Sequence, residues 1–235
     1  MATSINQILT SEDLTKKRTP PELYSWWRKK SDELYKFSSE SRKAYRLHEG
    51  LAKPFMEELF PLSLFGKRKF GDIDKIFLQL IIGNQRYDAI LTDLRTDTAW
   101  HSYIEITQSH NGKEQYLRDL VLYKKGSVFT FDNVIKTGTK KTGIEVSVQP
   151  LIVDVEKAAE NDLNNILAAV KKKTGKIYPA NTSLIIFFDD RLHFPRVIDD
   201  IQLDDFVKKN ILCLDLTFSS LFLVGFDHVF REFNL

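Results

Sequence analysis

Two acidic residues, Asp88 and Glu105, stand in neighbouring segments that both have the pattern of a β-strand, 87–92 and 102–107. Side chains two residues apart on a strand point to the same side, so Glu105 and Thr107 are expected to share one face. Carboxylates from adjacent strands can hold a hard divalent cation, and such a cation lowers the pKa of an attacking water. The spacing therefore makes Asp88 and Glu105 candidates for metal-assisted chemistry.

The elements that would position these acids follow from the spacing of the apolar residues. Three-and-four spacing predicts helices, and alternating or continuous apolar runs predict strands. The predicted helices are 22–37, 41–59, 113–124, 155–173 and 204–209, and the predicted strands are 76–82, 87–92, 102–107, 184–188 and 221–226. Pro54 is expected to kink or split its helix. The segment 126–149 has short β-like runs that the pattern does not assign.

This order of elements predicts an α/β protein with a mixed central β-sheet flanked by helices. Hydrophobic residues make up 43% of the chain and charged residues 28%, which is the usage of a folded domain. The longest apolar runs are far shorter than the roughly 20 residues of a membrane-spanning helix, and the first ten residues lack the features of a secretory leader. We therefore expect a cytoplasmic location and no membrane contact.

Other common sites are not indicated by the sequence. It contains no phosphate-binding glycine loop, dinucleotide-binding fingerprint, serine-hydrolase elbow or zinc-protease motif. The single cysteine, Cys213, cannot form an intramolecular disulfide or a cysteine-cluster zinc site, and its apolar surroundings predict a core residue.

The helix, the strand meander and its acids resemble the PD-(D/E)XK restriction-endonuclease-like family over about 41–189. In that family an Asp on the second strand and a Glu two residues before a Lys on the third strand bind the metal. Asp88 and Glu105 match the two acids, and Thr107 stands in the position of the Lys. The residue pattern predicts an arm and helix over 1–40. The resemblance implies a restriction-endonuclease-like core over 41–235, Mg²⁺ or Mn²⁺ as cofactor, and hydrolysis of phosphodiester bonds in DNA.

The resemblance also implies a metal-binding Glu from the preceding helix. Glu49 is the first candidate because it borders the apolar stripe, with Glu57 and Glu58 as rivals. Threonine can neither supply a positive charge nor act as a base near neutral pH. Gln108 or Lys113 could therefore take over the function of the missing lysine at Thr107.

Several basic residues could contact the phosphates of a nucleic acid. Arg118 could bind a phosphate or pair with Glu114 four residues earlier on the same helix. The cluster Lys67, Arg68 and Lys69 could follow a phosphate backbone.

The net charge of +2 does not by itself require such a partner. DNA is the expected partner and RNA the second choice. The oligomeric state stays open, a homodimer included. The alternative function is a catalytically inactive nuclease-fold protein that binds nucleic acid or another protein.

Overall fold

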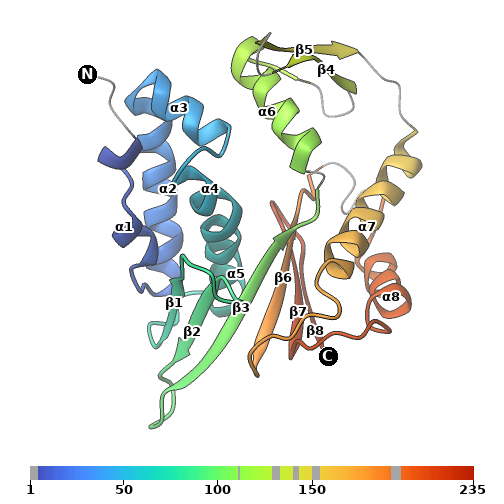
Figure 1. Cartoon of the computed structure of the whole chain (residues 1–235). Coiled ribbons are helices and arrows are strands. Elements are labelled where there is room, and N and C mark those ends of the chain that lie inside the picture. The colour runs from blue at the N-terminus through green and yellow to red at the C-terminus, as the bar shows by residue number, and fades with distance from the viewer. Residues whose placement is uncertain (1–4, 111, 129–132, 140–142, 150–153, 192–196) are drawn as a thin grey trace.

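A mixed six-stranded sheet forms the centre of the computed structural model, which describes residues 5–110, 112–128, 133–139, 143–149, 154–191 and 197–235 (Figure 1). Its strand order is β1-β2-β3-β6-β7-β8, in which β3, β6 and β7 are parallel and the outer pairs are antiparallel. The strands are β1 (Ile76–Leu80), β2 (Ala89–Asp93), β3 (Trp100–Gln108), β6 (Thr182–Phe188), β7 (Ser220–Gly225) and β8 (Phe230–Asn234). This confirms the predicted α/β class with a mixed sheet. The pattern missed β8.

Helices cover both faces of this sheet (Figure 1). One face carries η1 (Ile5–Gln7), α1 (Ser11–Thr15), α2 (Pro20–Phe37) and α5 (Phe60–Phe70), and the other carries α7 (Val155–Lys171) and α8 (Asp200–Asn210). The central strand β6 supplies both cores, with Ile185 in the first and Leu184 and Ile186 in the second. Strand side chains alternate between faces, so a strand covered on both sides must be apolar throughout.

The N-terminal segment belongs to the first core. Leu9, Leu14 and Leu23 are buried together with Phe65 and Leu78. The backbone of Arg18 also forms an isolated antiparallel bridge with that of Leu78 on β1. The arm and helix predicted for 1–40 therefore pack on the sheet from residue 8 onward.

The predicted helix 41–59 is interrupted earlier than expected. Ser38 caps α3 (Ser39–Arg46), which ends before a turn where His48 and Gly50 have positive φ angles of 51° and 59°. Glycine adopts this left-handed backbone at little cost, which explains a break at this point. A new helical run then begins with α4 (Ala52–Pro54). It continues through η2 (Phe55–Leu59) and α5 as far as Phe70.

The irregular turn η2 has π-helical hydrogen bonding, and Pro61 explains it. In a regular helix residue 61 would donate its N–H to the carbonyl of Glu57, but proline has no N–H and its ring clashes with that carbonyl. The backbone widens instead, and the N–H of Phe60 donates to the carbonyl of Phe55. The prediction that the helix ends near Pro61 was wrong, because this wide turn accommodates the proline.

The unassigned segment contains a small hairpin beside α6 (Gly112–Lys125). Strands β4 (Asn133–Thr139) and β5 (Gly143–Gln149) pair with each other outside the main sheet (Figure 1). Val146 packs with Leu117 and Val121 of α6 in a third, smaller core. A two-stranded ribbon is only marginally stable alone, so this contact with α6 stabilises it.

The structure also bears on the predictions for Cys213 and for membrane-spanning helices. Cys213 is exposed, so the prediction of a core cysteine was wrong. The apolar run around it forms a turn after α8 in which Ile211 is buried while Cys213 is not. In the described part of the chain, no helix has both the length and the apolar character needed to cross a bilayer.

Candidate active site

Asp88 and Glu105 lie where the pairing between β2 and β3 ends. The last pair of this register joins Ala89 with Ile104, and Asp88 and Glu105 are the next residues of the two chains. The N–H of Asp88 donates to the carbonyl of Ile104 at 2.8 Å, and Asp88 Oδ2 accepts the N–H of Ile106 at 2.7 Å. Ile104 and Ile106 are buried in the first core, as their alternation predicted.

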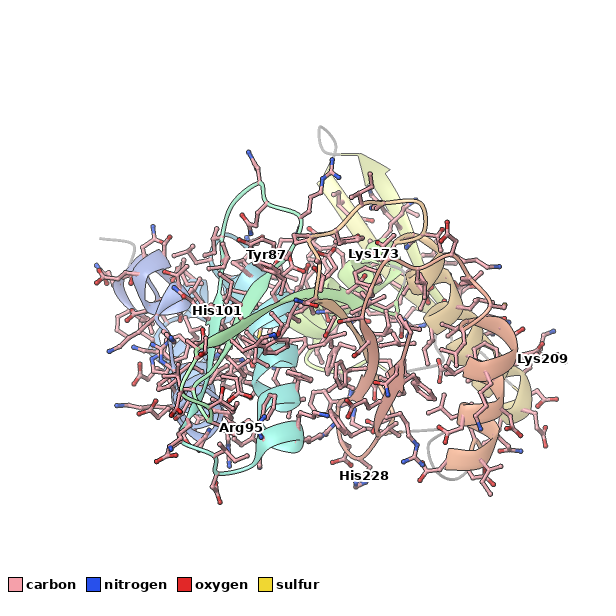
Figure 2. The ribbon with its side chains drawn as sticks, turned by 90° about the horizontal axis from the view of Figure 1, so that it is seen from below. Tyr87, Arg95, His101, Lys173, Lys209 and His228 are labelled. Atoms are coloured by element: carbon pink, nitrogen blue, oxygen red, sulfur yellow. The ribbon has the colours of Figure 1, made fainter. Side chains whose placement is uncertain are left out.

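Glu105 makes an ion pair with Lys173, which comes from a distant part of the sequence. The Lys173 Nζ and Glu105 Oε1 atoms lie 2.5 Å apart, and the two side chains are only 15% and 12% exposed. Lys173 follows the C-terminal end of α7, and in Figure 2 it lies toward the middle of the molecule, whereas Lys209 and His228 lie at its edge. The sequence pattern does not single out Lys173, because cations at a helix C-terminus are favourable in any protein.

A third carboxylate, Glu58, reaches this region from the π-helical turn. Burial raises the pKa of Glu58 to about 7, and the negative charges of Asp88, Glu57 and Glu105 add to the effect against the opposing charge of Lys53. The charges of Asp88 and Glu105 therefore act on Glu58. From the sequence, Glu58 was only an alternative candidate to Glu49.

The pKa of Asp88 is also raised, to about 6. Burial is the main cause and the charge of Glu105 the second, while the N–H of Ile106 and the charge of Lys173 act in the opposite direction. The same two carboxylates, after burial, contribute to raising the pKa of the Tyr178 phenol to about 12. Negative charge thus accumulates here in a partly buried environment, where a bound cation is stabilised.

The residues present fit a magnesium ion with few protein ligands. Among the described residues, no group of three or more His, Cys, Asp and Glu side chains is arranged to surround a metal ion. Mg²⁺ usually keeps several waters and is bound through one or two carboxylates together with phosphate oxygens of the substrate. Asp88 and Glu105 supply two carboxylates, and the charge of Glu105 acts on Asp88.

The structure places Glu49 and Glu57 in other surroundings. Glu49 is exposed in the turn after α3 and pairs with Lys43 at 3.6 Å. Glu57 Oε1 lies 3.2 Å from His48 Nδ1. Burial alone would raise the pKa of Glu57, but the hydrogen bond and charge of His48 outweigh it, so the pKa is lowered. Of the helix glutamates proposed as metal ligands, Glu58 is therefore the one whose pKa is raised by the charges of Asp88 and Glu105.

Thr107 and the two residues proposed to take over the lysine function, Gln108 and Lys113, differ in position. Thr107 follows Glu105 by two residues on β3 and is partly exposed. Gln108 Nε2 donates to the carbonyl of Glu57 at 3.2 Å, which is the carbonyl that Pro61 leaves without its helical donor. Gln108 thus stabilises the turn that carries Glu58. Lys113 is exposed in the first turn of α6.

The predicted phosphate-binding residues have partners within the chain. Arg118 donates to Glu114 Oε1 at 3.0 Å, which is the helical pair weighed as its alternative. Lys67 Nζ lies 4.0 Å from the ring centroid of Tyr24, and Lys69 pairs with Glu232. Phosphate contacts by these residues stay predictions.

Arg68 holds together the turn between β7 and β8. Its guanidinium donates to the carbonyls of Gly225 at 2.7 Å, Asp227 at 2.8 Å and Val229 at 2.9 Å. The buried Asp190 accepts the N–H groups of residues 227–229 at 2.6–2.7 Å from the other side of the same turn. A phosphate contact by Arg68 would require breaking these bonds.

Comparisons with known proteins found no family model, no curated protein and no solved structure that matches this chain significantly. The function is therefore inferred from the geometry and electrostatics of the site.

Proposed function

We propose that this protein is a Mg²⁺-dependent nuclease that hydrolyses phosphodiester bonds in DNA. The observation that supports the proposal is the partly buried ion pair between Glu105 and Lys173, with Asp88 and Glu58 near enough for the charge of Glu105 to raise the pKa of both. Asp88 and Glu105 would hold the cation, with Glu58 as an auxiliary acid. A bound Mg²⁺ supplies a Lewis acid that polarises a phosphoryl oxygen and lowers the pKa of a bound water.

Lys173 supplies the positive charge that Thr107 cannot supply. Its ammonium group is bound to Glu105, so it could act on the same reacting groups as the lysine of the resembled motif, although it comes from after α7. An ammonium beside the acids can stabilise the charge that develops on a phosphoryl group and can donate a hydrogen bond to the attacking water.

Glu58 has the acid strength suited to proton transfer. A general base or acid works best when its pKa lies near the operating pH. With a pKa of about 7, the Glu58 carboxylate can take up a proton at neutral pH and release it again. The low ordinary pKa of a glutamate would not allow this at an exposed position.

Cleavage of DNA and RNA in the presence of Mg²⁺ or Mn²⁺ tests the proposal. We expect Asp88→Asn, Glu105→Gln and Lys173→Met each to reduce the rate by about 10²–10⁴-fold, the range typical of groups that act on the reacting atoms. The matched controls are Glu114→Gln, an exposed helical glutamate, and Lys171→Met, two residues before Lys173. Cleavage that persists in both Asp88→Asn and Glu105→Gln would refute the proposal.

The same ion pair favours one second candidate, an inactive nuclease-fold protein that binds nucleic acid. Lys173 already neutralises Glu105, and a buried ion pair of this kind can have a structural role without taking part in catalysis. Metal-independent DNA binding by a folded wild-type chain, without cleavage under any of the conditions above, would support this second function over the first.

A further inference from the structure

A polar cavity of about 360 Å³ lies beside the candidate active site. Its lining includes His110, which follows β3, Gly112 at the start of α6, and Lys172, which directly precedes Lys173. Cavities that bind small ligands have volumes of roughly 300–1,000 Å³. The cavity is therefore large enough for a ligand group, and Lys172 in its lining is the sequence neighbour of Lys173, which pairs with Glu105.

One stripe of α7 forms a wall of this cavity. Asn165, Ala168, Ala169 and Lys172 all line it, and their spacing of three, four and seven residues puts them on one helix face. The two alanines leave room in the middle of the stripe, and polar groups stand at both ends. Larger side chains at these helix positions would fill the space.

The charges around the cavity favour an anion. Its lining contains no carboxylate side chain, and Lys172 is exposed and makes no ion pair with any carboxylate in the described ranges. Gly112 is the first residue of α6, a 14-residue helix, and the free N–H groups of a helix N-terminus attract negative charge. The ammonium group of Lys172 and the N-terminus of α6 therefore contribute positive charge to a lining that contains no acid.

His110 gives an independent indication of a ligand. Its Nδ1 atom is buried and has no hydrogen-bond partner within the part of the chain that the structure describes. Burial lowers the pKa of His110, and the charges of His48 and Lys172 act in the same direction against that of Glu57. Buried polar atoms are normally hydrogen-bonded, and a ligand in the cavity could supply the missing partner of this nitrogen if the imidazole ring turned toward it.

We infer that this cavity binds a phosphate group of the nucleic-acid strand whose neighbouring phosphodiester lies at Asp88 and Glu105. The inference rests on the proposed nuclease function. Gln108, which also lines the cavity, is three residues beyond Glu105 on β3, a distance of about 10 Å along the strand, so one bound strand can reach both places. The group is either an internal phosphodiester or a terminal phosphate, which share the same chemistry.

Binding of short single-stranded oligonucleotides in the presence of EDTA tests this inference without cleavage. We expect Lys172→Met to weaken binding by about tenfold or more, the worth of a charged hydrogen bond, and to reduce the slope of log affinity against log salt by about 0.7. Lys171→Met, the exposed neighbouring lysine, should leave both unchanged. A stronger loss for 5′-phosphorylated than for 5′-hydroxyl oligonucleotides identifies a terminal phosphate, and equal losses identify an internal one.

A second variant and a second readout protect the test against misfolding. Ala168→Glu places a negative charge in the cavity at an exposed helix position. We expect this variant to weaken binding as much as Lys172→Met does. Its control is Asn161→Glu, at an exposed position two helical turns earlier. In the wild-type chain, NMR titration should show that the oligonucleotide raises the pKa of the His110 imidazole. Equal affinities for Lys172→Met, Ala168→Glu and their controls would overturn the inference even if cleavage is found. Loss of binding in a chain that does not cleave would instead uphold the phosphate site and reject the nuclease.

Discussion

Replacing Glu58 with glutamine should stabilise the protein at high pH and weaken its activity. The folded chain raises the pKa of Glu58 from 4.5 to about 7, chiefly by burial and then through Asp88 and Glu57. At about 1.4 kcal/mol per pH unit this corresponds to roughly 3 kcal/mol, and partial exposure of the side chain reduces the expected effect to about 2 kcal/mol. Glutamine keeps the shape and removes the charge.

The effect has a defined pH dependence. Below pH 4.5 Glu58 is protonated in the folded and the unfolded chain, so Glu58→Gln and the wild type should be equally stable. Between pH 4.5 and 7 the unfolded chain releases the proton first, so the wild type loses stability as the pH rises. Above pH 7 the full difference applies, and for a chain of this length it should raise the Tm of the variant by about 4–8 °C.

Thermal unfolding followed by circular dichroism from pH 4 to pH 9 measures this difference, and Glu57→Gln provides the control. Glu57 is the adjacent residue, but its pKa is lowered because His48 overcomes the effect of burial, so its removal should destabilise the protein above pH 4.5. Opposite signs for the two neighbouring variants are the expected result. A Glu58→Gln variant less stable than the wild type at pH 8 would refute the electrostatic reasoning.

Three further predictions follow from other parts of the structure. Lys173→Met should lower the free energy of unfolding at neutral pH by about 2–3 kcal/mol because it leaves Glu105 partly buried and unpaired, and a urea midpoint equal to that of Lys171→Met would contradict this. Gly225→Ala should cost about 1–3 kcal/mol in urea unfolding because its new Cβ would collide with the Asp190 carboxylate; an unchanged midpoint would show that the turn adjusts freely. Mg²⁺ at ten times its Kd should stabilise the wild type at pH 8 by about 1.4 kcal/mol, measured by thermal unfolding, and Asp88→Asn should respond far less; equal responses would place the ion elsewhere.

The placement of Asp88 and Glu105 was predictable because it depends on local pattern. The alternation in 102–107 specifies which side chains enter the core, and a short connection between neighbouring strands favours antiparallel pairing. The structure confirms both, with Ile104 and Ile106 buried and β2 antiparallel to β3. The helices and most strands follow from the same periodicities.

The remaining parts of the candidate site depend on long-range packing. Lys173 is 68 residues from Glu105 in sequence, and nothing in the lysines at the end of α7 distinguishes it from its neighbours. Glu58 depends on the wide turn caused by Pro61, whereas the sequence pattern indicated a regular helix ending there. A proline seven residues after Pro54 was the available signal for an irregular turn.

The basic cluster at the end of α5 shows the limit of charge patterns. Three consecutive cations resemble a phosphate-binding patch, yet Arg68 is bound by the carbonyls of a turn that lies about 160 residues later in the chain. Only the packing of α5 on β7 brings these groups together. The position of an arginine in the sequence therefore does not indicate whether its N–H groups will bind a ligand or the protein's own backbone.

A crystal soaked in Mn²⁺ tests most directly whether Asp88 and Glu105 hold a divalent cation together. The account predicts an anomalous difference peak bonded to a carboxylate oxygen of each residue at about 2.0–2.2 Å, and no such peak in Asp88→Asn crystals soaked in the same way. A map without a peak at these carboxylates, or an identical peak in the variant, would contradict it.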